Sequence, residues 1–250
     1  MSHRPNNSGS YDERVNATSQ VSTTKTKIFE SVLSRVYSLS ALVRRRNSPF
    51  VTSYLGNLQG IEIGAAAHNR YYLDAINVDR WGASDTAYKR QERELVFHSA
   101  KVDIVAPGDE LPFDDDSVDF VFSSHVIEHF PNPIGALYEW VRVARRYVVL
   151  VAPHRDRTFD AGRNLTTTDE LLTRYGQGFT SEQDRHWSVW TCESFLELCE
   201  RIGLRVVDHL DPDDKIGNGF IVVIDATIKP GRAVVRGAPA GDQATPSETL

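Results

Sequence analysis

Residues able to transfer protons gather in the segment that follows the apolar run 147–152. His154 and Asp156 come directly after this run, and His186 stands later in the same polar segment. Histidine, with an ordinary pKa of about 6.5, readily accepts a proton at neutral pH. We predict His154, Asp156 and His186 as catalytic residues that remove a proton from a hydroxyl, with His154 as the preferred base. The competing interpretation for both histidines is a hydrogen-bonded role in supporting the segment.

The same segment offers a second kind of chemistry, which is metal binding. Imidazole nitrogens and carboxylate oxygens together suit divalent ions such as Mg²⁺, Mn²⁺ or Zn²⁺, and a metal ion acidifies a hydroxyl bound to it. The candidate ligands are His154, Asp156, Asp184 and His186. Pairs of Asp and His two residues apart do not fix a metal geometry, so ordinary hydrogen bonds and ion pairs among these side chains are the alternative.

Elements that must position these residues alternate along the chain. Residues 134–143 and 191–202 carry apolar side chains at helical spacing, with Thr191 as a plausible N-cap. Alternation of strands and helices implies a mostly parallel sheet with helices on both faces, and the last two strands, joined only by a loop, must be antiparallel if they are neighbours. The strand candidates are residues 58–63, 75–78, 102–105, 118–122, 147–152, 204–210 and 220–228.

Composition and charge exclude several classes of protein. The chain has 250 residues, with 28 basic and 34 acidic side chains and a net charge of −6, which argues against a broad basic surface for nucleic acid. Its apolar runs are too short to span a bilayer, which takes roughly 20 residues. The two cysteines show no metal-type spacing, and we predict a cytoplasmic location.

One folded domain is expected over residues 25–229. The flanking segments 1–24 and 230–250 are poor in large apolar residues, and we predict that both are disordered tails. Residues 28–42 have the spacing of an amphipathic helix that ends at the arginine cluster 44–46. This helix either packs on the domain or contacts anionic lipid or another polyanion.

A loop of small residues follows the first strand candidate. Glu62 lies two residues before Gly64, and Ala65 and Ala66 let the backbone approach a ligand closely. Asp79 ends the second strand candidate, where a bound nucleoside would present its ribose hydroxyls. Farther on, the sequence LPFDDDSVDF leads into the fourth strand candidate, which continues as SSHVIEH.

With these motifs in this order, residues 60–153 resemble the class I S-adenosylmethionine (SAM)-dependent methyltransferases, in particular their type 11 group. That group pairs an ExG loop with a downstream LPF-D-x-S-x-D strand and a helix start at EH. The resemblance implies SAM as the cofactor and a Rossmann-like, seven-stranded, mostly parallel sheet with an antiparallel last strand. The chain departs from the group in two places: the usual GxGxG loop reads Gly64-Ala65-Ala66, and Pro107 replaces the acid that commonly meets the adenine.

The resemblance also implies where the cofactor lies. Asp79 would take the ribose hydroxyls and Arg80 would flank the base, while Ser124 and His125 would lie beneath the sulfonium. Glu62 and the loop after it would follow the methionine moiety and the ribose. With Asp109 and Glu110 in place of the missing adenine acid, the implied cofactor-binding residues are Glu62, Gly64, Ala65, Ala66, Asp79, Arg80, Asp109, Glu110, Ser124 and His125.

The segment 153–190 is expected to form a lid that binds the acceptor. It combines many charged side chains with Phe159, Tyr175, Trp187 and Trp190, a mixture suited to a sugar or another polyhydroxylated molecule. Aromatic packing within the lid itself explains these residues equally well. We predict methyl transfer to a hydroxyl of a small polar acceptor, with a saccharide as a candidate.

Other functions remain open at this point. If the protein is an enzyme, the alternative reaction is methylation of nitrogen or carbon in a small metabolite or a quinone. An apolar acceptor such as a quinone would predict an apolar lid, whereas this segment is charged. A non-catalytic cofactor-binding module is favoured if His154 and His186 point away from the sulfonium. A nucleotide-dependent oxidoreductase would need a glycine-rich pyrophosphate loop, which residues 64–67 supply poorly.

Overall fold

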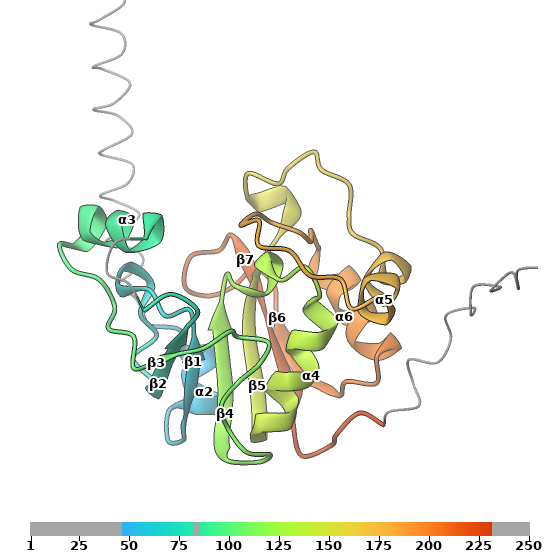
Figure 1. The fold of residues 1–250 in the computed structure, drawn as a ribbon, viewed down its shortest axis with the longest axis horizontal. Coiled ribbons are helices and arrows are strands. Elements are labelled where there is room, and N and C mark those ends of the chain that lie inside the picture. The colour runs from blue at the N-terminus through green and yellow to red at the C-terminus, as the bar shows by residue number, and fades with distance from the viewer. Residues whose placement is uncertain (1–46, 83–85, 232–250) are drawn as a thin grey trace, which may run out of the picture. The chain divides into compact units, whose positions relative to one another are not determined.

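The computed structural model describes residues 47–82 and 86–231, whose arrangement is shown in Figure 1. The predicted tail 1–24, the predicted helix over 28–42 with its arginine cluster, and the chain beyond residue 231 lie outside the described residues. Within the described part of the chain, no helix is both long and apolar enough to cross a membrane.

The strands form one seven-stranded sheet in the order β3-β2-β1-β4-β5-β7-β6. Strands β1 to β5 are parallel to one another, whereas β7 is antiparallel to both β5 and β6. The predicted fold is therefore confirmed, and the reversal follows from the short loop that joins β6 to β7. The strands are β1 Gln59–Ile63, β2 Asp74–Asp79, β3 Ile104–Val105, β4 Val118–Ser124, β5 Ala144–Pro153, β6 Val206–Leu210 and β7 Gly219–Asp225.

Helices cover both faces of the sheet. Alternate residues of the central strands accordingly belong to two separate apolar clusters, one on each face. Val148 and Leu150 of β5 pack in the cluster that holds Trp140 of the helix α4 and Phe195 of α6. The neighbouring strand residues face the other side, where they pack against α2. The helices are α2 Pro49–Leu55, α3 Ala87–Val96, α4 Pro133–Val143, α5 Thr168–Gly176 and α6 Cys192–Arg201, and the short 3-10 turns are η1 Ala67–Asn69, η2 Ile127–His129 and η3 Arg155–Arg157.

Side-chain caps fix where the two predicted helices begin. The Thr191 hydroxyl accepts the backbone N–H of Ser194, and the Ser194 hydroxyl accepts that of Thr191, which confirms Thr191 as the N-cap of α6. At α4 the Asn132 side chain accepts the backbone N–H of Gly135 at 3.1 Å, with Pro133 in the first turn. Both helices thus start directly after loops that reach the carboxyl edge of the sheet.

The carboxyl ends of β1, β2 and β4 meet at one edge of the sheet. Ile63 is in register with Val78 of β2 and with Ser123 of β4, so the residues that follow these positions lie side by side. Parallel α/β sheets bind their ligands at such an edge.

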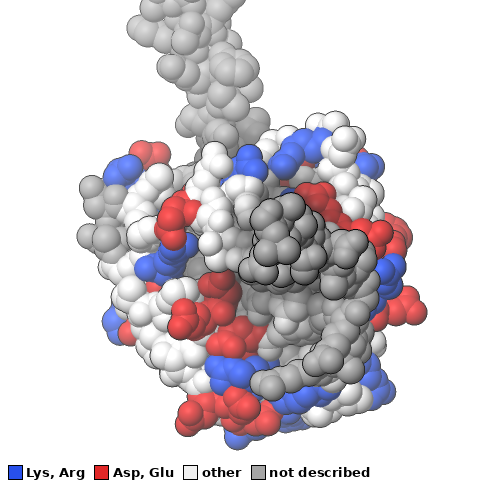
Figure 2. Space-filling model, turned by 45° about the vertical axis from the view of Figure 1, so that its right-hand side comes forward, with Lys and Arg blue, Asp and Glu red and all other residues white. Residues whose placement is uncertain are grey.

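On the face drawn in Figure 2, basic and acidic side chains are intermixed over the described residues.

Candidate active site

The loop after β1 is held close to β2 by its backbone. Gly64 has a φ of +68°, and its N–H donates to the carbonyl of Val78 at 2.9 Å. The next N–H, of Ala65, donates to the Asn77 side chain at 3.2 Å. This loop therefore leaves β1 in a left-handed turn that glycine adopts without strain.

Replacing Gly64 by alanine is expected to destabilise the fold by about 1–2 kcal/mol and to weaken cofactor binding. The added Cβ would lie 2.9 Å from Cγ2 of Val126, in a backbone conformation that L residues rarely adopt. Urea unfolding and SAM titration would measure both effects. Gly176→Ala is the matched control, because no atom lies within 4 Å of its Cβ and it ends a helix. Equal behaviour of the two variants would contradict this account.

The predicted cofactor residues at β2 and β3 are placed along the same edge. Asp79 ends β2, and its carboxylate accepts the N–H of Trp81 at 2.9 Å. Arg80 is exposed, lies over the Trp81 ring and pairs with Glu182 at 2.6 Å. Asp109 and Glu110 lie on an exposed turn after β3. Asp79, Arg80, Asp109 and Glu110 thus all follow or end strands at the carboxyl edge of the sheet.

Helix α3 brings two buried charges to this edge that sequence reasoning missed. The ammonium of Lys89 lies 3.0 Å from Glu92 and 3.8 Å from the carboxylate of Asp79. The Glu92 carboxylate also accepts the N–H of Ala67 at 3.0 Å. Helix α3 thus anchors the loop after β1 through hydrogen bonds between the backbone of the loop and the side chains of Glu92 and Lys89, and Lys89 lies 3.8 Å from the predicted ribose-binding carboxylate.

Glu62 lies on β1 next to a buried lysine from the loop between β6 and β7. Burial raises the pKa of Glu62 to about 7, although Arg70 and Lys215 oppose the shift. Burial likewise lowers the pKa of Lys215 to about 8, and its ammonium donates to the carbonyl of Arg70 at 2.7 Å. A carboxylate in this position would gain from a bound ammonium group.

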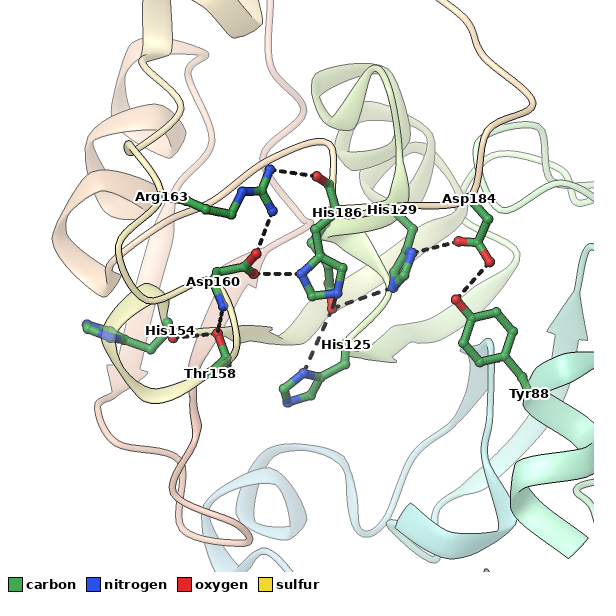
Figure 3. Close-up of polar contacts among 10 residues, drawn as sticks. Tyr88, His125, His129, His154, Thr158, Asp160, Arg163, Asp184 and His186 are labelled. Atoms are coloured by element: carbon green, nitrogen blue, oxygen red, sulfur yellow. Dashed lines mark hydrogen bonds and ion pairs between the residues drawn. The ribbon is translucent and has the colours of Figure 1, made fainter. Parts of the chain in front are cut away.

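Directly after Ser124, the chain forms a cluster around the buried carboxylate of Glu128, which we call the histidine cluster (Glu128 with His125, His129 and His186). Neither carboxylate oxygen of Glu128 has a hydrogen-bond partner, and the residue is fully buried. Its Oε1 lies 3.8 Å from Nδ1 of His125, 4.0 Å from Nε2 of His129 and 3.9 Å from Nε2 of His186 (Figure 3). Burial raises the pKa of Glu128 to about 8.

Two outer carboxylates orient the rings of this cluster. Nδ1 of His186 lies 2.6 Å from Asp160, which is buried and also pairs with Arg163. Nδ1 of His129 lies 2.9 Å from Asp184. A carboxylate accepts hydrogen bonds, so each Nδ1 carries a proton, and the Nε2 atom of each ring faces Glu128.

A pocket of about 540 Å³ opens onto the histidine cluster. Its walls combine aromatic rings, two arginines and two histidines of the cluster. Tyr88 reaches it from α3, where its hydroxyl donates to Asp184 at 2.8 Å. The lining residues are Tyr88, His129, Phe159, Arg163, Arg185 and His186.

His154 and Asp156 lie away from this cluster. Nδ1 of His154 accepts the backbone N–H of Asp156 at 3.1 Å and so caps the turn η3. Figure 3 shows the His154 ring directed away from His186. Asp156 is exposed and pairs with its neighbour Arg155 at 2.7 Å. The Nδ1 atom of His154 is thus engaged with the backbone of η3 and does not face the histidine cluster.

The structure thus brings together His186 and Asp184 of the predicted metal ligands and leaves His154 and Asp156 apart. Among the described residues, the group with three potential metal-ligating side chains within 4.8 Å of one another is Glu128, His129 and His186. The EH dipeptide at 128–129 was a signal in the sequence. The supporting residues Tyr88 and Asp160 gave no signal of their own, because folding alone brings them to the site.

Comparison with known proteins assigns part of the chain to a family. Residues 55–152 match the family model described as a methyltransferase domain. This stretch is a class I SAM-dependent methyltransferase domain. The resemblance stated from the motifs is thereby confirmed, and SAM is the cofactor of the domain. Among curated protein sequences, none matches the chain significantly.

Solved structures of methyltransferases are distantly similar to the chain. A SAM-dependent methyltransferase from Thermotoga maritima is 19% identical with a TM-score of 0.47, over 80% of this chain and 98% of that one. The magnesium protoporphyrin IX methyltransferase of Synechocystis, solved with S-adenosylhomocysteine, is 13% identical with a TM-score of 0.42, over 75% and 83%. Nothing about the site or acceptor of this methyltransferase follows from likenesses this distant.

Proposed function

We propose that this methyltransferase transfers the methyl group of SAM to a hydroxyl of a small polar acceptor held in the pocket. The observation that carries the proposal is the position of the histidine cluster. It begins at His125, directly after Ser124 at the end of β4, and two of its histidines line the pocket. In this proposal, an acceptor in the pocket presents its hydroxyl to the histidine cluster.

The cofactor would lie along the carboxyl ends of β1, β2 and β4. In this proposal Glu62 binds the methionine ammonium, the loop 64–66 follows the ribose, and Asp79 accepts the ribose hydroxyls. Arg80, Asp109 and Glu110 border the base, and Ser124 and His125 lie beneath the sulfonium. Support comes from the register of the three strands, which sets these residues along one edge.

Methyl transfer is an in-line displacement in which the bond from sulfur to the methyl carbon breaks as the bond from oxygen to that carbon forms. The acceptor hydroxyl gives up its proton at the histidine cluster, and neutral S-adenosylhomocysteine leaves with the electron pair of the broken bond. Enzymes accelerate such a reaction largely by aligning the two reactants. Residues 153–190 serve here as the acceptor lid, since Phe159, Arg163, Arg185 and His186 all come from this segment.

Two arginines in the pocket lining support a polyhydroxylated or anionic acceptor, although apolar atoms make up most of the exposed lining. Arg163 and Arg185 place two cations at its walls, while Tyr88 and Phe159 supply aromatic faces. Planar guanidinium groups bind hydroxylated and carboxylated molecules through several donors. A saccharide or sugar acid fits this lining. The buried free thiols Cys192 and Cys199 suit the predicted cytoplasmic location.

A transfer assay with methyl-labelled SAM tests this function directly. The full chain is incubated with a panel of monosaccharides, sugar acids and nucleotide sugars, and with amines and quinones of similar size. We expect label in an O-methyl group of a polyhydroxylated acceptor. Label confined to nitrogen or carbon would contradict the proposal, and SAM binding with no transfer across the panel would favour a cofactor-binding module.

A further inference from the structure

We propose that Glu128, His129 and His186 bind one divalent ion of a first-row transition metal, with His125 adjacent to it. This site differs from the metal ligands predicted from the sequence, since only His186 is shared. The binding site stands on its own geometry, whereas its part in catalysis rests on the proposed function.

The first argument is the convergence of electron pairs. The outer carboxylates Asp160 and Asp184 accept the Nδ1–H groups of His186 and His129, so both Nε2 atoms face Oε1 of Glu128. Three potential ligand atoms thus meet at a buried carboxylate, and both Glu128 oxygens lack a hydrogen-bond partner. Buried polar groups are normally satisfied, so a cation between these atoms supplies the missing partner.

The second argument is distance. Bonds of about 2.1 Å from a metal to nitrogen and oxygen place tetrahedral ligand atoms about 3.4 Å apart. The histidine nitrogens now lie 3.9 Å and 4.0 Å from Oε1 of Glu128. All three atoms lie within 4.8 Å of one another, so small side-chain rotations would bring them to bonding distance of one ion.

The third argument is the support behind the ligands. A ligating histidine usually donates its other ring N–H to a carboxylate, which fixes the tautomer and raises the basicity of the ligand. Both histidines have such a carboxylate. Asp160 is in turn held by Arg163, and Asp184 accepts the Tyr88 hydroxyl. The outer contacts come from α3 and from both halves of the lid, so the site is assembled by the tertiary fold.

The donor set indicates which ions would bind. Two imidazoles and one carboxylate suit Zn²⁺, Fe²⁺, Co²⁺ or Ni²⁺, whereas Mg²⁺ prefers an all-oxygen shell with water. The three protein ligands leave coordination positions open toward the pocket that His129 and His186 line. An acceptor hydroxyl bound at an open position would lose its proton to solvent more easily, and the oxygen would then attack the methyl carbon.

Metal binding can be measured without cofactor or acceptor. The full chain is freed of metal with a chelator and dialysed against Zn²⁺ or Co²⁺, and the bound metal is then counted by mass spectrometry and followed by cobalt absorption. We expect one Zn²⁺ or Co²⁺ per chain and much weaker binding of Mg²⁺. Asp160→Asn should lower the Zn²⁺ affinity by about 10–100-fold, as loss of an outer carboxylate does elsewhere.

Variants of the ligands decide the outcome. His186→Ala and the near-isosteric Glu128→Gln should abolish stoichiometric binding, while His209→Ala on exposed β6 should bind as the wild type. Circular dichroism establishes that each variant is folded. Absence of binding by the wild type, or equal binding by the ligand variants, would overturn the metal site and leave the proposed function intact. Bound metal without transfer to any hydroxyl would leave the site standing and reject the function.

Discussion

His186→Ala should lower the rate of methyl transfer by about 100-fold or more, while the affinity for SAM stays within about twofold of the wild type. His186 is held by Asp160 at 2.6 Å and lines the pocket, so its loss removes a group that acts on the acceptor oxygen. It does not belong to the strand ends at which SAM is expected to bind. Turnover with labelled SAM and calorimetric titration of the same variant would separate the two effects.

His154→Ala distinguishes this account from the prediction made from the sequence. The His154 ring caps the turn η3 and points away from the cluster, so its loss should reduce turnover much less than the loss of His186. The exposed His209→Ala serves as the control for a neutral histidine substitution. If His154→Ala were the more damaging variant, the assignment of the active centre to the histidine cluster would be wrong.

The affinity for SAM should rise by up to about tenfold per pH unit between about pH 5 and about pH 7. Burial raises the pKa of Glu62 to about 7, so the free protein carries a neutral Glu62 below that pH. The methionine ammonium of SAM favours the ionised carboxylate, and binding therefore releases a proton in this window. As the pH rises, releasing the proton of Glu62 costs less free energy, so SAM binds more tightly. Calorimetric titrations across the window would measure the dependence.

Glu62→Gln tests the cause of this pH dependence. Without a titrating carboxylate, the affinity should be weaker at neutral pH and nearly constant from about pH 5 to about pH 7. Lys215 also faces Glu62, but it keeps most of its positive charge in this window, since its pKa falls only to about 8. The rise should end near pH 8, where an α-amino group of pKa about 8 loses its own proton. An unchanged slope in Glu62→Gln would show that another group is responsible.

The sheet and the cofactor edge could be predicted because their signals are local. Apolar runs marked every strand, and the motif residues Gly64, Asp79 and Ser124 end or follow three of them. The helix α3 gave no such signal, because it buries Lys89 and Glu92 where an apolar pattern would normally reveal a helix. When charged side chains pair with each other in the interior, apolar residues no longer recur at the helical spacing by which a helix is predicted from sequence.

The acceptor side could be predicted only in part, because tertiary contacts decide it. His154 stands at the end of a central strand, but a three-residue turn uses its lone pair and turns the ring aside. His186 faces Glu128, far away in the sequence, because the backbone N–H of Trp187 donates to the carbonyl of Glu128 at 2.8 Å. Neither the turn nor this long-range contact has a signature in residue type or spacing.

The most direct test of the central claim is a calorimetric titration of SAM and S-adenosylhomocysteine into the full chain near pH 7. The arrangement of Glu62, the Gly64 loop and Asp79 at one edge predicts that one molecule of each ligand binds per chain. It also predicts a clear loss of affinity in Asp79→Asn, whose amide is a weaker acceptor for ribose hydroxyls than a carboxylate. A folded protein that binds neither ligand, or an Asp79→Asn variant with unchanged affinity, would contradict the placement of the cofactor along the ends of β1, β2 and β4.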